Sequence, residues 1–161
     1  MARTGKMLVN VLLVGDQPAK LLALETILDS ESYRLIRAGF GHEAVRRLEG
    51  DDFAVILLDV QLSGLDGLQT ARLIRACERS RHTPIIFISG TESAAFSPAE
   101  ADTLGHVDYL VKPVIPAVLR AKVKVFVELF RLTRHVKKHV RVEEDLKEAS
   151  RRKDGFLTML G

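Results

Sequence analysis

The feature that most constrains the fold is an alternation, between residues 10 and 112, of short β-branched apolar runs with amphipathic stretches. Parallel strands are joined by long crossovers, usually helices, so this alternation predicts βαβ units around a parallel sheet. The expected strands are residues 11–14, 34–38, 54–58, 84–88 and 107–111. We therefore expect an α/β protein.

Polarity predicts where these strands lie within the sheet. Residues 11–14, 54–58 and 84–88 are continuously apolar, as expected for strands that helices cover on both faces. Residues 34–38 and 107–111 carry more polar side chains, so we expect them nearer the edges.

Helices are expected between and after the strands. Pro18 suits the first turn of one helix, residues 41–48 and 65–77 have the pattern of two more, and Ser97 would cap a short fourth. From residue 117 to about 153 there is no Gly or Pro, which predicts one long helix. We expect a compact domain over residues 1–125 and an extended helical connector over residues 126–161.

The C-terminal part of the chain carries apolar residues in alternating three- and four-residue steps, which is the heptad spacing of a coiled coil. They are Val125, Leu129, Leu132, Val136, Leu146, Leu157 and Leu160. Polar residues occupy the intervening seam positions, namely His139, Glu143, Ser150 and Lys153. The pattern predicts a marginal coiled coil, through which two copies of the chain could form a homodimer.

Composition and charge exclude several classes of protein. The single cysteine, Cys77, cannot form an intrachain disulfide, which suits the reducing cytoplasm. The apolar run after Met7 is interrupted by Asn10 and Asp16, so we expect neither a signal peptide nor a membrane span. The net charge of +3 comes largely from basic residues late in the chain. No recognition motif accompanies them, so we do not expect nucleic-acid binding.

Candidate functional residues lie where the expected strands end: Gly15-Asp16, Asp59, Ser89 and Lys112. In parallel α/β sheets, ligands bind beyond the carboxyl ends of the strands. Two carboxylates, a hydroxyl and an ammonium at one edge suit Mg²⁺ together with a phosphoryl group. Asp59 could then attack phosphorus, while Lys112 and Ser89 stabilise the transferring oxygens.

Each residue has a plainer interpretation when it is taken alone. A strand-end aspartate or serine is usually a turn or cap residue, Lys112 would be a solvated charge, and Tyr109 a half-buried strand aromatic. Their joint placement at matching strand ends favours the functional interpretation.

A resemblance to a known family rests on the segments VLLVGDQP, VILLDVQLSGLDGLQ, PIIFISGTE and VDYLVKP. Over residues 8–125 the chain resembles the receiver domain of response regulators in two-component signalling. The resemblance implies a flavodoxin-like, doubly wound, five-stranded parallel sheet of order 2-1-3-4-5 with a long C-terminal helix. It also implies that the domain accepts a phosphoryl group from a histidine kinase or a histidine phosphotransfer domain.

The resemblance further implies roles for residues on the matching positions. These are Asp59 as the phosphorylated aspartate, Asp16 and the backbone carbonyl of Gln61 as further Mg²⁺ ligands, Ser89 and Tyr109 as switch residues, and Lys112 before a cis Pro113. The chain departs from the family pattern at Gly15, where a second acid is usual, and at Ser63, where proline is usual. We expect the missing acid to weaken Mg²⁺ binding without abolishing it.

Two other interpretations stay open. Gly15 could mark a decaying metal site in a receiver-like module that dimerises without phosphorylation. Alternatively, LRAKVKVFVELFRL and EASRRKDGFLTML resemble the connector between a receiver and a downstream histidine kinase. The chain ends at Gly161, before the phosphorylated histidine that this second resemblance implies. We therefore expect a piece of a hybrid kinase, with no enzyme activity of its own beyond its own phosphorylation and dephosphorylation.

Overall fold

The structure is a computed structural model that describes residues 8–60, 65–90 and 98–134. The strands are β1 (Val9–Val14), β2 (Tyr33–Ala38), β3 (Val55–Asp59), β4 (Ile85–Ser89) and β5 (Val107–Val111). The helices are α1 (Pro18–Leu28), α2 (His42–Gly50), α3 (Leu65–Ala76), the short 3₁₀ helix η1 (Glu78–Ser80), α4 (Pro98–Asp102) and a helix over residues 116–134. Strands and helices alternate, as the sequence pattern predicted.

The strands form one five-stranded parallel sheet in the order β2-β1-β3-β4-β5. This order confirms the predicted fold class. The continuously apolar strands β1, β3 and β4 are central, and the more polar β2 and β5 are the edges, as their polarity predicted.

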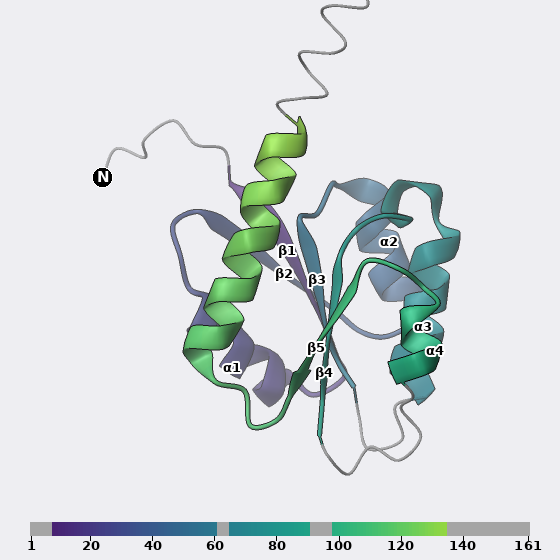
Figure 1. Ribbon diagram of the computed structural model, residues 1–161, viewed down its shortest axis with the longest axis horizontal. Helices are drawn as coiled ribbons and strands as arrows, with labels where there is room; N and C mark the ends of the chain where they lie inside the picture. Colours follow the sequence, from purple (N-terminus) through teal and green to yellow (C-terminus); the bar gives the residue numbers. More distant parts are fainter. Residues whose placement is uncertain (1–7, 61–64, 91–97, 135–161) are drawn as a thin grey trace, which may run out of the picture. The chain divides into compact units, whose positions relative to one another are not determined.

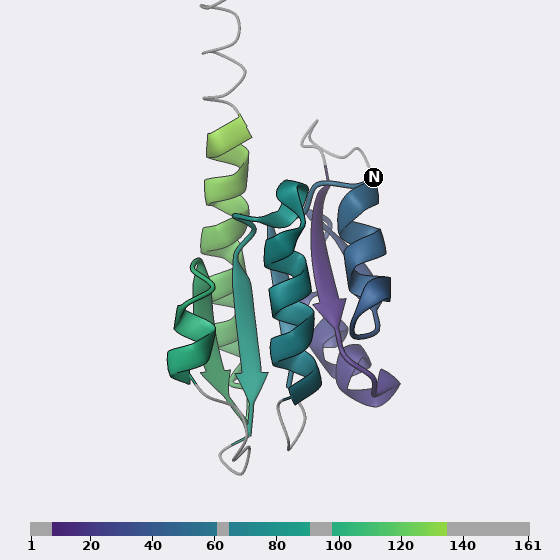
Figure 2. The ribbon, with the colours of Figure 1, turned by 90° about the vertical axis from the view of Figure 1, so that its right-hand side faces the viewer.

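Helices cover both faces of the sheet. Helices α2, α3 and α4 lie on one face, whereas α1 and residues 116–127 lie on the other (Figures 1 and 2). Because successive strand residues point to opposite faces, each central strand supplies apolar side chains to both layers. Leu12, Ile56 and Phe87 belong to one core cluster with residues of α2 and α3. Leu119 and Val123 of the C-terminal helix are also fully buried.

The chain divides into two compact units, Met1–Val127 and Glu128–Gly161. The helix over residues 116–134 has Pro116 in its first turn, where a missing N–H costs nothing. Most of the predicted coiled-coil seam and the Ser97 cap lie outside the described residues. The predicted division between residues 125 and 126, and the coiled coil itself, therefore stay predictions.

Among the described helices, none has both the length and the apolar character needed to span a bilayer.

Candidate phosphorylation site

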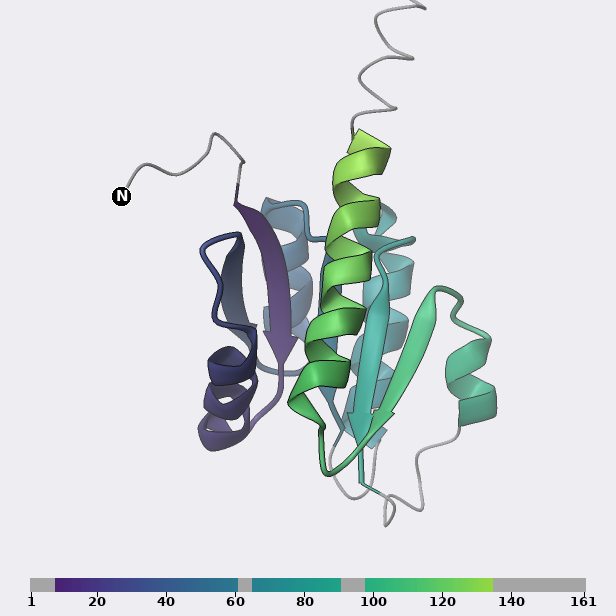
Figure 3. The same cartoon turned by 60° about the vertical axis from the view of Figure 1, so that its left-hand side comes forward.

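The carboxyl ends of the parallel strands lie at one edge of the sheet (Figure 3), and the sequence-predicted residues are at or next to these ends. Asp59 is the last residue of β3 and Ser89 the last of β4, so both belong to the strands themselves. Gly15-Asp16 follows β1, and Lys112 follows β5. The parallel register fixes this arrangement, because Asp59 pairs with the residue before Ser89, and Ser89 pairs with the residue before Lys112.

A short ion pair at this edge joins Asp59 and Lys112. Lys112 Nζ donates to Asp59 Oδ1 at 2.6 Å, and the Asp59 residue is only 3% exposed. The backbone N–H of Lys112 also donates to the Ser89 carbonyl at 2.9 Å, and the Lys112–Pro113 peptide bond is cis. A buried carboxylate is therefore held beside one ammonium whose backbone is anchored to the neighbouring strand.

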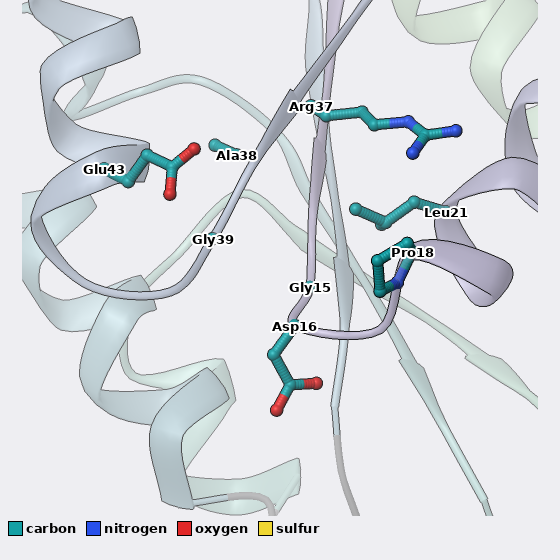
Figure 4. Close-up of a pocket in the computed structure, with 8 residues that line it drawn as sticks. All are labelled: Gly15, Asp16, Pro18, Leu21, Arg37, Ala38, Gly39 and Glu43. Carbon is teal, nitrogen blue, oxygen red and sulfur yellow. The ribbon is translucent and has the colours of Figure 1, made fainter.

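Asp16 differs from Asp59 in being exposed. It lines an open pocket of about 330 Å³ together with Gly15, Pro18, Leu21, Arg37, Ala38, Gly39 and Glu43. Figure 4 shows the Asp16 carboxylate turned away from Leu21 and Arg37. Asp16 thus combines solvent access with a position next to the buried end of β3.

The donor set at this edge fits Mg²⁺, which takes one or two carboxylates and completes its octahedron with waters and phosphate oxygens. Asp16 and Asp59 supply those carboxylates, while Gln61 lies outside the described residues. In the described part of the chain, no three His, Cys, Asp or Glu side chains gather into a metal-binding group. An ion held here would therefore keep coordination positions open for water and phosphate.

The backbone at Gly15 can carry a side chain, although its first atom would be closely packed. A Cβ atom at this position would lie 3.2 Å from Leu21 Cδ2 and 3.5 Å from Asp59 Cβ. The first contact is tight but meets the flexible end of a leucine, so small adjustments would relieve it. The absence of a second acid is thus a property of the sequence and is not imposed by the backbone.

The two predicted switch residues lie on adjacent strands, Ser89 on the central strand β4 and Tyr109 on the edge strand β5. Ser89 is half-buried at the end of β4, and the Tyr109 ring of β5 stacks on Phe87 of β4, with 5.9 Å between ring centroids. The Tyr109 hydroxyl donates to Asp102, the last residue of α4. Burial, with the Asp102 hydrogen bond and the nearby carboxylate charges, raises the pKa of Tyr109. The phenol therefore stays protonated and links β5 to α4.

Sequence reasoning missed Asp102 as a partner of this tyrosine. An acidic residue at the end of a short helix is usually exposed to solvent. No sequence motif connects Asp102 with Tyr109 on the following strand. The contact depends on how α4 returns the chain to β5.

The comparisons with known proteins identify a family over most of the chain. The family model described as response regulator receiver domain matches residues 11–124. The sensor histidine kinase GacS of Pseudomonas protegens is 34% identical over 107 residues, which are 65% of this chain and 12% of that protein. The signal transduction histidine-protein kinase BarA of Shigella flexneri is 30% identical over 109 residues, which are 68% of this chain and 12% of that protein. The chain thus spans only about an eighth of these relatives.

Solved structures show the same fold. The receiver domain of sensor histidine kinase PA1611 from Pseudomonas aeruginosa PAO1, which has a magnesium ion coordinated in its active-site cleft, is 32% identical with a TM-score of 0.62. The similarity covers 76% of this chain and 99% of that one. The chemotaxis protein CheY4 of Vibrio cholerae has a TM-score of 0.63 at 24% identity, covers 74% of this chain and 99% of its own, and supports the fold alone.

Proposed function

The chain belongs to the response regulator receiver domain family, and from that membership we propose that Asp59 accepts a phosphoryl group from a phosphohistidine. The observation that carries the proposal is the buried Asp59 carboxylate with the Lys112 ammonium 2.6 Å away. An isolated buried carboxylate is costly, so its retention beside one lysine at a ligand-binding edge supports a chemical role.

In the proposed reaction, a carboxylate oxygen of Asp59 attacks phosphorus while the bond between phosphorus and the histidine nitrogen breaks. The products are an acyl phosphate on Asp59 and a free imidazole, which takes up a proton. Lys112 would neutralise one phosphoryl oxygen, and Ser89 would hydrogen-bond another. Asp16, Asp59 and the Gln61 carbonyl would hold Mg²⁺, which supplies charge neutralisation for the phosphoryl oxygens.

The proposed output begins at Ser89 and Tyr109. If Ser89 moves toward the phosphoryl group, Tyr109 can follow, and its hydrogen bond to Asp102 would then break. That change would free α4 from β5 and alter the surface that leads into the C-terminal helix. Tyr109 and α4 thus provide a physical connection between the sheet edge that carries Asp16 and Asp59 and the rest of the domain.

The proposed partners are a histidine kinase or a histidine phosphotransfer domain, and the proposed location is the cytoplasm. The relatives GacS and BarA are histidine kinases, which supports a hybrid-kinase context for a receiver of this kind. The single cysteine supports a reducing compartment.

Phosphorylation by a small phosphodonor tests the proposal directly. In the presence of Mg²⁺, the chain should gain one phosphoryl group, as measured by intact-protein mass spectrometry. Beryllofluoride should also shift the backbone amide signals in its NMR spectrum.

Gly15 favours the rival interpretation, a receiver-like module that works without phosphorylation. Failure to bind Mg²⁺ in the millimolar range, together with no response to beryllofluoride, would support that rival.

Gly15→Asp should tighten Mg²⁺ binding by about tenfold, because a third carboxylate adds Coulomb attraction near the ion. Gly15→Ala is the matched control, since it adds the Cβ contact with Leu21 without the charge. Isothermal titration with Mg²⁺ measures both variants. Equal affinities in the two variants would show that the carboxylate contributes nothing.

A dimer through the C-terminal helix is also proposed, supported by exposed apolar residues at heptad spacing. Val125 is 54% exposed and Leu129 is 51% exposed. The double variant Val125→Glu with Leu129→Glu should convert dimer to monomer in sedimentation velocity, because facing glutamates would repel within an apolar seam. Lys124→Glu adds an acid off the seam and should leave the dimer intact. A double variant that stays dimeric would place the interface elsewhere.

A further inference from the structure

Two histidines meet at the end of the sheet opposite to Asp59. His82 lies in the turn before β4 and His106 in the turn before β5, so they lie at the amino ends of neighbouring strands (Figure 3). Both side chains are exposed. His82 Nδ1 and His106 Nε2 are 3.3 Å apart, and the ring centroids are 5.2 Å apart.

These two distances match two imidazoles bound to one tetrahedral ion. Nitrogens that each lie about 2.0–2.1 Å from a tetrahedral Zn²⁺ are separated by about 3.3 Å. The ring centres lie about 1.1 Å behind the nitrogens, which places them about 5.2 Å apart in the same arrangement. A direct N–H···N hydrogen bond between the two rings is the other explanation of the 3.3 Å distance, and metal titration separates the two.

We propose that His82 Nδ1 and His106 Nε2 form a binding site for a divalent transition-metal ion of the Zn²⁺ class. Neutral imidazole suits such ions better than Mg²⁺, which prefers oxygen ligands. In the described ranges no third His, Cys, Asp or Glu completes a group. Because both rings are exposed, water would fill the remaining positions, and we expect the ion to exchange readily with solvent.

Arg75 holds the two turns that carry these histidines in fixed positions. Its guanidinium donates to the carbonyls of Ser80, Leu104, Gly105 and His106 at 2.8–3.2 Å. Gly105 and His106 both have positive φ, of 70° and 54°, so the turn before β5 has a specific backbone conformation. A site that is already arranged loses less entropy when an ion binds.

The charge of Arg75 is the main opposing factor, since a cation repels a metal ion. Burial lowers the pKa of Arg75 to about 10, so the guanidinium stays charged at neutral pH. The carbonyl oxygens that accept its hydrogen bonds offset part of this positive charge within the turns. An ion at the two histidines would therefore add a link between turns that Arg75 already joins.

Zn²⁺ titration of the full chain tests this site. His135 and His139 are four residues apart in the sequence and could bind metal independently. Every protein in the test therefore carries His135→Gln and His139→Gln, has no affinity tag and is kept in excess Mg²⁺ to occupy the carboxylates. His82→Gln and His106→Gln should each weaken Zn²⁺ binding by about tenfold or more. Even the loss of a residue that only hydrogen-bonds to a metal ligand lowers metal affinity about tenfold to a hundredfold.

His42→Gln is the matched control, since His42 is exposed at the start of α2 and should leave Zn²⁺ binding unchanged. Thermal unfolding gives a second measurement: Zn²⁺ should raise the midpoint of the background protein but not of either test variant. Unchanged affinity in His82→Gln or His106→Gln would overturn the proposal. So would the absence of saturable Zn²⁺ binding by the background protein, which would leave the two histidines hydrogen-bonded.

Discussion

Asp59→Asn is expected to reduce phosphoryl incorporation from a small phosphodonor to background. The amide has the same shape as the carboxylate and keeps an oxygen that can accept from Lys112, so the fold should be preserved. It lacks the anionic oxygen that attacks phosphorus, and it removes one of the carboxylates proposed to hold Mg²⁺. Intact-protein mass spectrometry after incubation with acetyl phosphate and Mg²⁺ measures the loss.

Asp51→Asn is the control for this substitution. Asp51 is exposed beyond the end of α2, so the same change of charge there should leave the extent of labelling unchanged. Far-ultraviolet circular dichroism shows whether each variant keeps its secondary structure. Labelling that persists in a folded Asp59→Asn protein would assign the phosphoryl group to another residue.

The fold could be predicted because its causes are local and periodic. Continuous apolar runs require cover on both faces, and this requirement alone places β1, β3 and β4 in the centre of the sheet. Pro18 marks the start of α1 for an equally local reason, since it needs no intrahelical hydrogen-bond donor at the first turn.

The candidate site could be predicted only to the level of strand ends. Parallel pairing guarantees that Asp16, Asp59, Ser89 and Lys112 reach one edge, but not that Lys112 contacts the buried carboxylate at 2.6 Å. That distance depends on how the chain turns after β5. The room beside Gly15 is also set by side-chain packing, through Leu21 of α1.

Contacts between turns gave no signal in the sequence. Arg75 has the character of an exposed helical arginine, yet it binds carbonyls thirty and more residues away. The approach of His82 to His106 follows from the pairing of β4 with β5 and from the positive φ of His106. Neither contact joins residues at a sequence spacing that is typical of a known motif, so a single sequence could not predict it.

Lys112→Met should slow phosphorylation by about a hundredfold to a thousandfold. The side-chain length is kept, but the ammonium that would neutralise a phosphoryl oxygen is lost, and removal of one comparable donor elsewhere costs about that much. The rate of mass gain with acetyl phosphate, compared at saturating Mg²⁺, measures the effect. Because Asp59 itself remains, slow labelling should still reach completion.

The same substitution should also destabilise the protein by about 2 kcal/mol in the absence of Mg²⁺. The Asp59 side chain is 4% exposed and would lose its 2.6 Å counter-ion, and an unpaired buried charge is costly. The cost is reduced because Lys112 itself is 29% exposed and partly screened by water. Urea unfolding with and without Mg²⁺ measures it, and the ion should recover part of the loss by binding the freed carboxylate.

Lys122→Met separates these effects from the loss of an ordinary ion pair. Lys122 is as exposed as Lys112, at 32% against 29%, and pairs with Asp108 at 2.8 Å, but Asp108 is 32% exposed where Asp59 is 4%. Water can solvate the freed Asp108, so we expect a cost of less than about 1 kcal/mol, no recovery by Mg²⁺ and normal phosphorylation. If the two variants lose equal stability and label at equal rates, burial of Asp59 does not set the importance of its lysine, and the proposed role of Lys112 is wrong.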